Sequence, residues 1–236
     1  MDSAAFSRTE SNGGEVGKIK ILIADDHPLM LKALKDVLQK EPTFEVVGEA
    51  YNGKEAVKLA LELLPNVVIM DISMPELNGL EATRQIKAKC PSIAILVLTV
   101  HNDSEHIFGI LEAGASGYLT KSVFGEEIIH SVRSVAVGES VLTTQIMQQL
   151  IKHASKYTTK PVPLDAGEKL TAKELAILKL VARGMGNKDI ASTTGLSLRT
   201  VKSYLVDIFS KLDVDSRTKA VVLGLRAGFI SLDDLE

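Results

Sequence analysis

Short apolar runs alternate with amphipathic stretches along the first 140 residues of the chain. Each run is followed by apolar residues at helical spacing, as in residues 28–40, where Leu31, Leu34 and Leu38 recur with lysines between them. Parallel neighbouring strands need such crossover helices. We therefore predict an α/β fold, a doubly wound five-stranded parallel sheet, with strands at residues 19–24, 44–50, 66–71, 93–99 and 116–121 and helices at residues 28–40, 53–64, 80–89, 104–114 and 126–138.

The C-terminal part of the chain has helical periodicity only. Thr171 and Glu174 have the spacing of a capping box, and Gly195 lies in a tight turn between two helical stretches. This pattern predicts a small all-α helix-turn-helix domain. Its helices are expected at residues 171–184, 187–195, 197–212 and 216–228, and the third carries the apolar stripe Val201, Leu205, Ile208 and Leu212.

Composition changes mark the domain boundaries. Ser, Gly and Asn are frequent in residues 1–17, which we expect to be a disordered tail. Pro, Gly and Thr follow a single helical stretch at residues 144–155, which indicates a linker. We therefore place the sheet domain at residues 18–138, the linker with its helix at residues 139–167 and the helical domain at residues 168–236.

The composition is globular, with 45% hydrophobic and 24% charged residues. No stretch reaches the roughly 18 consecutive apolar residues that a membrane span needs, and the N-terminus has no signal-peptide pattern. The one cysteine, Cys90, excludes an internal disulfide framework and fits a reducing compartment. We therefore expect a cytoplasmic protein with no membrane partner.

The net charge differs between the two halves. Residues 18–140 carry 12 Lys and Arg against 17 Asp and Glu, a net of −5, whereas residues 168–236 carry 11 against 9, a net of +2. This difference indicates different partners for the two halves, although +2 is too small to establish nucleic-acid binding by itself.

Reactive side chains follow four of the predicted strands. Asp25 and Asp26 follow the first, Asp71 ends the third, Thr99 ends the fourth and Lys121 ends the fifth. Each alone also fits a helix cap or a solvated loop, but the carboxyl ends of parallel strands meet at one edge, where ligands bind. Clustered carboxylates need a cation, and oxygen ligands suit Mg²⁺, while the ammonium and hydroxyl suit an anionic group.

The N-terminal half resembles the receiver domain of two-component response regulators, which has a flavodoxin-like fold. The resemblance rests on Asp25-Asp26, on MDISMPELNGLEA, on the LT pair ending at Thr99 and on GYLTK, in order and spacing over residues 19–138. It implies that Asp71 is the phosphoacceptor. It further implies that Asp25, Asp26, Asp71 and the backbone carbonyl of Ser73 hold Mg²⁺, and that Thr99, Tyr118 and Lys121 contact the phosphoryl group or switch with it.

Residues 170–227 resemble the LuxR-type DNA-binding domain, and the whole chain resembles the NarL/FixJ family of transcriptional regulators. LTAKELAILKLVARG, NKDIA, TVKSYL and KLDVDSRTKAV carry this resemblance. The helix face opposite the apolar stripe includes Arg199 and suits the major groove. The resemblance implies base contacts by Lys202, Ser203 and Val206, phosphate contacts by Asn187, Lys188, Thr200, Lys211 and Arg217, and dimerisation through Val221, Val222 and Leu225.

Together these features predict a phosphorylation-dependent transcriptional regulator rather than an enzyme. The expected partners are a sensor histidine kinase, double-stranded promoter DNA, a second copy of the phosphorylated chain and RNA polymerase. We also expect the unphosphorylated chain to be monomeric, with its recognition helix occluded. A phosphorylation-independent DNA binder and an aspartyl-phosphate hydrolase remain alternatives, and the sequence specifies neither the kinase and its stimulus, nor the target genes, nor the sign of regulation.

Overall fold

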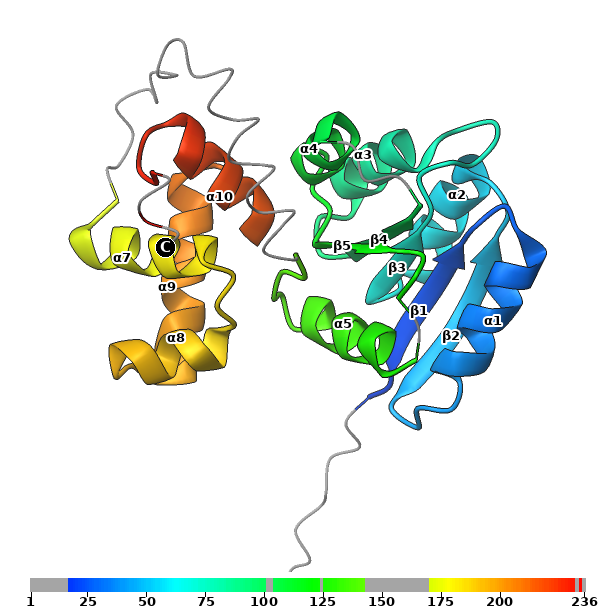
Figure 1. Cartoon of the computed structure of the whole chain (residues 1–236), viewed down its shortest axis with the longest axis horizontal. Helices are drawn as coiled ribbons and strands as arrows, with labels where there is room; N and C mark the ends of the chain where they lie inside the picture. Colours follow the sequence, from blue (N-terminus) through cyan, green and yellow to red (C-terminus); the bar gives the residue numbers. More distant parts are fainter. Residues whose placement is uncertain (1–16, 101–103, 124, 143–169, 232–233, 235–236) are drawn as a thin grey trace, which may run out of the picture.

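The computed structural model describes residues 17–100, 104–123, 125–142, 170–231 and 234. The described residues up to 142 form the sheet unit, and those from 170 onward form the helical unit (Figure 1). The predicted tail, apart from residue 17, and the predicted helix at residues 144–155 lie outside the described residues.

The sheet unit contains five parallel strands in the order β2-β1-β3-β4-β5. The order reverses at β1, which has β2 on one side and β3 on the other, so the carboxyl ends of β1 and β3 are the place where ligands bind in sheets of this kind. The strands are β1 (Ile19–Ala24), β2 (Phe44–Ala50), β3 (Val67–Met70), β4 (Ala94–Thr99) and β5 (Gly117–Thr120).

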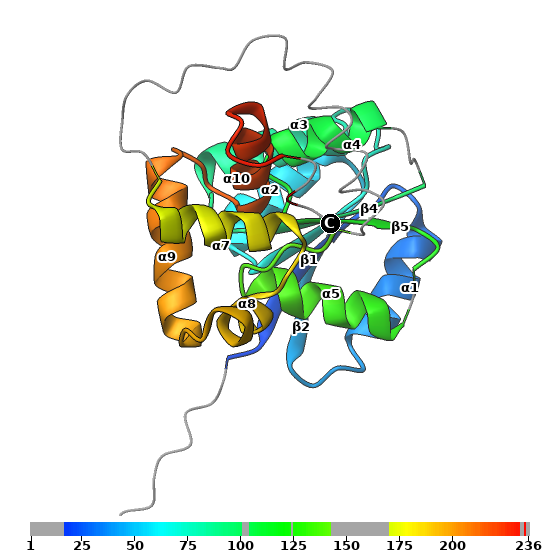
Figure 2. The ribbon, with the colours of Figure 1, turned by 60° about the vertical axis from the view of Figure 1, so that its left-hand side comes forward.

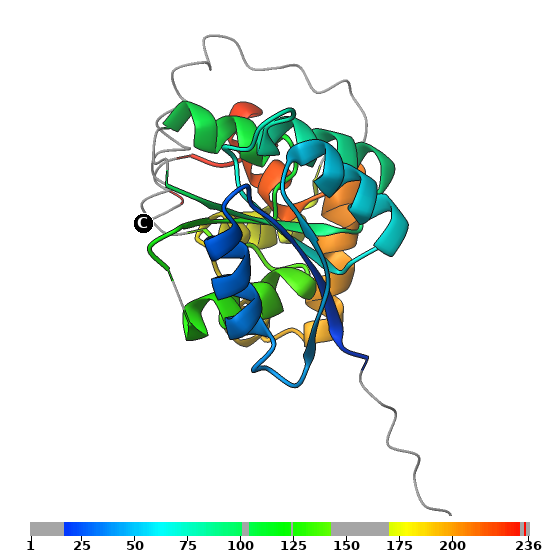
Figure 3. The ribbon, with the colours of Figure 1, turned by 90° about the vertical axis from the view of Figure 1, so that its right-hand side faces the viewer.

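Helices cover both faces of the sheet (Figures 1 and 3). α1 (Pro28–Leu38) and α5 (Glu126–Ala136) pack on one face, and α2 (Gly53–Leu63), α3 (Gly79–Lys89) and α4 (Ser104–Glu112) on the other. The side chains of Asn52 and Asn78 cap α2 and α3 by accepting from backbone N–H groups. The predicted doubly wound parallel sheet is confirmed.

The helical unit consists of α7 (Ala172–Ala182), α8 (Asn187–Thr194), α9 (Leu198–Lys211) and α10 (Arg217–Arg226). Thr171 and Glu174 form the predicted capping box at the start of α7. Gly195 ends α8 with a φ of 69°, in the left-handed region that glycine adopts without strain, and so turns the chain into α9. The predicted stripe on α9 is buried in the core.

The two units are in contact. α10 packs against α4, and the ribbons of both helices can be followed in Figures 1 and 2. Arg226 Nη2 lies 2.7 Å from Glu112 Oε1. A second polar contact joins the chain after α5 to α10, where Ser140 Oγ lies 3.1 Å from Thr218 Oγ1. None of the helices within the described ranges is long and apolar enough to cross a membrane.

Candidate functional site

Two carboxylates meet at the point where the strand order reverses. Asp25 follows β1, and its backbone N–H donates to the carbonyl of Ala50 at 3.0 Å. Asp71 follows β3, and its backbone N–H donates to the carbonyl of Ala24 at 2.9 Å. Both side chains are buried, with 2% and 3% of their surface exposed. The sheet itself therefore fixes the position of both acids.

Lys121 links the two carboxylates. Its backbone N–H donates to the carbonyl of Thr99 at 2.8 Å, which holds the residue at the end of β5. Its Nζ lies 2.7 Å from Asp25 Oδ2 and 3.0 Å from Asp71 Oδ2. The N–H of Ile72 donates to the other oxygen, Asp71 Oδ1, at 2.8 Å. Asp71 thus presents both oxygens to donors in a buried site.

The protonation states follow from burial and from this pairing. Burial raises the pKa of the Asp71 carboxyl above its ordinary value, and the hydrogen bond from Lys121 offsets only part of that rise. For Lys121, burial opposes the charge, but the hydrogen bonds from its Nζ to Asp25 and Asp71 outweigh it and raise the pKa of the ammonium. Lys121 therefore stays charged at neutral pH.

The acidic cluster has the donor set of a hard cation. Oxygens of Asp25, Asp26 and Asp71 and a ring nitrogen of His27 lie within 4.8 Å of one another. Oδ1 of Asp26 is buried and makes no hydrogen bond to a described residue, although His27 Nδ1 lies 2.8 Å away. A buried carboxylate oxygen without a donor is a free ligand position. The three carboxylates therefore fit Mg²⁺.

The loop after Asp71 runs close to the start of α3. The N–H of Gly79 donates to the carbonyl of Ile72 at 2.9 Å, and a Cβ at Gly79 would lie 2.0 Å from the carbonyl oxygen of Asp71. Only glycine fits there, so α3 supports the backbone of the acid directly. Ser73 is exposed in this loop, and the predicted role of its carbonyl in holding Mg²⁺ stays a prediction.

Thr99 and Tyr118 lie beside this cluster, on β4 and β5. Both are completely buried, and Tyr118 is among the largest fully buried side chains. Its ring belongs to the core cluster that contains Ile107 and Ile110 of α4. A change at Tyr118 would therefore alter the core into which α4 packs, and α4 contacts α10.

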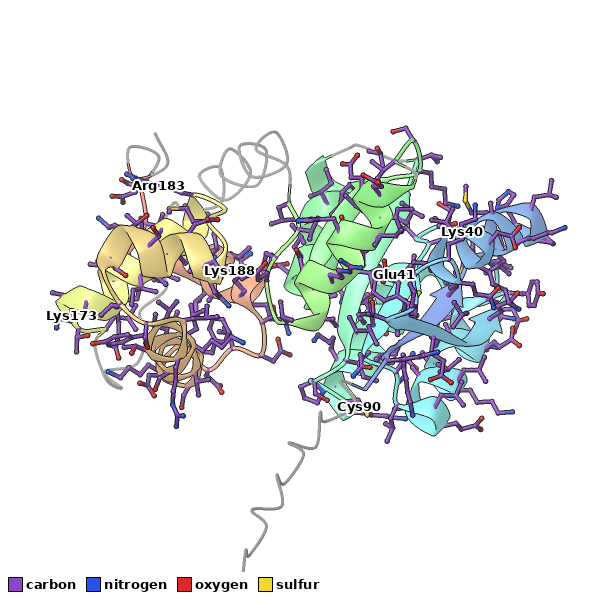
Figure 4. All side chains as sticks on the ribbon, turned by 90° about the horizontal axis from the view of Figure 1, so that it is seen from below. Lys40, Glu41, Cys90, Lys173, Arg183 and Lys188 are labelled. Atoms are coloured by element: carbon purple, nitrogen blue, oxygen red, sulfur yellow. The ribbon has the colours of Figure 1, made fainter. Side chains whose placement is uncertain are left out.

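The outer face of α9 carries exposed side chains of several kinds. Lys202, Ser203 and Val206, predicted to approach bases, are exposed, with 66% of the Val206 surface accessible. Arg199 is exposed as well, and so is Lys188 of α8, on the side of the helical unit nearest the sheet unit (Figure 4). Thr200 is half-buried and donates its N–H to Ser197 Oγ at 3.1 Å. The predicted occlusion of the recognition helix therefore does not take the form of buried base-reading side chains.

Three predicted phosphate-contacting side chains are instead engaged within the chain. Lys211 Nζ lies 3.0 Å from Oε2 of the buried Glu174, and this pair ties the end of α9 to the start of α7. Arg217 and Asn187 are buried, with 5% and 3% exposure, and Arg217 Nη1 donates to Asn187 Oδ1 at 2.9 Å. Arg217 also donates to the carbonyl of Met185, and burial lowers its pKa to about 10.

The residues of α10 that are predicted to form the dimer contact do not lie on an exposed face of the helix. Val221 and Val222 are buried, with 3% and 5% exposure, and Leu225 is half-buried. α10 contacts both α7 and the α4 helix of the sheet unit. The role of these residues in dimerisation stays a prediction.

The sequence did not reveal two charged residues at the contact between the units. Glu139, after α5, accepts the backbone N–H of Asn187 at 3.3 Å. Lys87 on α3 is 4% exposed and donates from Nζ to the carbonyls of Pro91 and Ile93 at 2.7 and 2.9 Å. Neither belongs to a motif, and both line a pocket together with Asp215 and Arg217 of the helical unit.

Comparison with known proteins covers both units. A family model described as the response regulator receiver domain matches residues 21–133, and one described as bacterial regulatory proteins, luxR family, matches residues 168–223. Over 215 residues the chain is 38% identical to the transcriptional regulatory protein YdfI of Bacillus subtilis (strain 168), covering 91% of this chain and 99% of the relative. It is 37% identical to the transcriptional regulatory protein LiaR of the same organism, covering 88% of this chain and 97% of the relative.

A solved structure is similar as well. The crystal structure of a two-component response regulator of the LuxR family from Aurantimonas sp. SI85-9A1 is 32% identical, covers 59% of this chain and 99% of its own, and has a TM-score of 0.54. The chain therefore belongs to the NarL/FixJ family of two-component response regulators, transcription regulators that join a receiver domain to a LuxR-type helix-turn-helix domain.

Proposed function

We propose that Asp71 accepts a phosphoryl group from a sensor histidine kinase and that this modification controls binding of the helical unit to promoter DNA. The observation that carries the proposal is the contact of Lys121 with both Asp25 and Asp71 at the sheet edge. A nucleophilic carboxylate, acidic metal ligands and an ammonium are the groups that phosphoryl transfer to a carboxylate needs.

The proposed chemistry uses the two groups that donate to the Asp71 carboxylate, the Ile72 N–H and Lys121 Nζ. A carboxylate oxygen of Asp71 forms the new bond to phosphorus, while the bond from phosphorus to the imidazole nitrogen of the donor breaks. The Ile72 N–H keeps the carboxylate oriented, and Lys121 shifts from the carboxylate to the phosphoryl oxygens, where negative charge accumulates. Asp25, Asp26 and the Ser73 carbonyl would hold Mg²⁺, which supplies further neutralisation of the phosphoryl charge.

The helical unit is the proposed DNA-binding part. Lys202, Ser203 and Val206 on the outer face of α9 enter the major groove, and Lys188 contacts the phosphate backbone. One weakly basic helical unit makes few phosphate contacts, so a phosphorylated homodimer supplies the second set. In this proposal α10 leaves α4 on phosphorylation and becomes available to a second chain.

The hydrolase alternative lacks support from the residues near Asp71. An aspartyl-phosphate hydrolase needs an acid–base carboxylate two residues after its nucleophile, and Ser73 occupies that position. We therefore propose a phosphoacceptor that is no enzyme in the usual sense. We also propose the cytoplasm as its location and residues 18–138, 139–167 and 168–236 as its receiver domain, linker and DNA-binding domain.

Incubation with acetyl phosphate and Mg²⁺, followed by intact mass measurement, tests the phosphoacceptor. One added phosphoryl group in the wild type, none in Asp71→Asn and none after chelation of Mg²⁺ are the expected results. Asp36→Asn, which removes an exposed acid of α1, is the matched control and should be phosphorylated like the wild type. Phosphorylation of Asp71→Asn to the same extent would contradict the proposal.

A further inference from the structure

The start of α8 carries an anion supplied by the other unit. Gly186 is the N-cap residue of α8 and has no side chain to cap it. Oε1 of Glu139, from the sheet unit, accepts the N–H of Asn187 at 3.3 Å and would lie 3.5 Å from a Cβ at Gly186. The first N–H groups of a helix are unsatisfied and carry partial positive charge, so a carboxylate is stabilised there.

Basic side chains surround this carboxylate. A groove of about 690 Å³ between α5 and α8 is lined by Glu139 together with Lys188, Lys202 and Arg217. The guanidinium of Arg217 is buried beside Asn187, and this burial lowers its pKa. The negative charge of Glu139 offsets part of that lowering. Two acids line this groove, Asp189 of α8 itself and Glu139, and Glu139 is the one that the sheet unit supplies. Figure 2 shows α5 and α8, whose residues line the groove.

Three of the residues at this place, Asn187, Lys188 and Arg217, are predicted to contact DNA phosphates, and Lys202 is predicted to approach bases. Helix N-terminal N–H groups and Lys or Arg side chains bind phosphate oxygens in protein–DNA complexes. A carboxylate oxygen and a phosphate oxygen are both anionic acceptors and cannot occupy one position. DNA that reaches the start of α8 must therefore displace Glu139.

The segment that carries Glu139 is hydrogen-bonded to the edge of the sheet at Tyr118. The backbone N–H of Glu139 donates to the carbonyl of Ser134 at 3.0 Å. Two residues later, the carbonyl of Val141 accepts the N–H of Tyr118 at 2.8 Å, and Val141 forms a parallel bridge with Gly117. A shift of the β5 backbone at Tyr118 would therefore move the segment that carries Glu139.

We propose that Glu139 is an intramolecular stand-in for a DNA phosphate, which occupies the anion position at the start of α8 until phosphorylation withdraws it through β5. This inference rests on the proposed function and adds the device that keeps the unphosphorylated chain off DNA. It differs from simple burial of the recognition helix, because the base-reading side chains of α9 stay exposed.

Glu139→Gln in the full-length chain tests the inference. Glutamine keeps the shape and still accepts the N–H of Asn187, so the units stay docked, but the anion is gone. Binding is measured to a labelled duplex of mixed sequence, about 30 base pairs long, at low salt, because phosphate contacts are independent of sequence. Without a phosphoryl mimic, Glu139→Gln is expected to bind about tenfold more tightly than the wild type.

The matched control is Glu126→Gln, which removes an exposed charge from the first turn of α5, outside the groove. It should bind like the wild type, and with saturating beryllofluoride the wild type and Glu139→Gln should bind equally. Equal affinity of Glu139→Gln and the wild type without beryllofluoride, or an equal gain in Glu126→Gln, would overturn the inference. A wild type unaffected by beryllofluoride would instead contradict the proposed function.

A second measurement needs no substitution. In the amide NMR spectrum of the chain without DNA, the N–H of Ile72 reports that beryllofluoride occupies the site, because it donates to Asp71. When that resonance moves, the Asn187 resonance is expected to move as well, since Glu139 leaves its N–H. An unmoved Asn187 resonance in a chain whose Ile72 resonance has shifted would refute the withdrawal of Glu139.

Discussion

The ammonium of Lys121 lies 3.0 Å from Oδ2 of Asp71, so the cation that would receive an incoming phosphoryl group already neutralises the carboxylate that would accept it. Lys121→Met leaves Asp25 and Asp71 buried without this partner. We expect the free energy of unfolding to fall by about 3–5 kcal/mol in buffer without divalent cations, the usual cost of breaking a buried ion pair. Urea unfolding with and without Mg²⁺ measures the loss.

Magnesium should restore part of the stability of Lys121→Met, because it neutralises the same carboxylates and binds only the folded chain. Lys89→Met removes an exposed lysine of α3 and serves as the control, with stability close to that of the wild type. If Lys121→Met were as stable as this control without Mg²⁺, the pairing seen in the structure would not operate in solution.

Asp26 should contribute to Mg²⁺ affinity more than to folding. Its Oδ1 is buried without a hydrogen bond to a described residue and lies 2.8 Å from Nδ1 of the exposed His27, so Asp26→Asn removes a ligand charge and only a weak exposed contact. We expect weaker Mg²⁺ binding by at least about tenfold and a melting temperature, without Mg²⁺, no lower than that of the wild type. Isothermal titration with Mg²⁺ checks this, and unchanged affinity would exclude Asp26 as a ligand.

Lys87 should make stability rise with pH. Burial lowers the pKa of Lys87 from 10.5 to about 8, so between these values the unfolded chain holds a proton that the folded chain has lost. Stability therefore increases as pH rises through this window, by as much as about 3 kcal/mol. Urea unfolding of the wild type and of Lys87→Met at both ends of this pH window measures how much Lys87 contributes to the free energy of unfolding. If the stability of Lys87→Met rises with pH by the same amount, other groups cause the rise.

Lys188 and Arg217 should separate DNA binding from stability. Lys188 is exposed, so Lys188→Ala should weaken DNA binding and reduce the salt dependence by about one phosphate contact, at unchanged stability. Arg217→Met instead leaves the side-chain oxygen of Asn187 and the carbonyl of Met185 without their buried donor, at a cost of about 1–3 kcal/mol each. Thermal melts and DNA-binding isotherms of both variants test this difference. A melting temperature of Arg217→Met equal to that of the wild type would contradict the prediction.

The sheet and its acidic edge could be predicted because they depend on local pattern. A strand such as β3 is apolar throughout and ends one residue before Asp71, so its position along the chain already determines where the carboxylate lies. The stripe on α9 is equally local, since its spacing alone places it in a core.

The contact between the units could not be predicted in the same way. Asn187, Arg217 and Val221 belong to positions that the resemblance assigns to DNA or to a second chain, yet all three are buried. Their burial comes from packing within the helical unit and against the sheet unit, which depends on surfaces far apart in sequence. In the sequence, Glu139 is a single acidic residue in a predicted linker. Its role became visible only because its carboxylate accepts the N–H of Asn187 at the start of α8.

DNA affinity with and without beryllofluoride, compared between the wild type and Asp71→Asn, tests the central claim most directly. Measured by fluorescence anisotropy on a promoter fragment, the wild type should bind more tightly and as a dimer when beryllofluoride and Mg²⁺ are present. Asp71→Asn should show neither change. An affinity that is the same in all four conditions would contradict control by phosphorylation of Asp71 and would favour a phosphorylation-independent DNA binder.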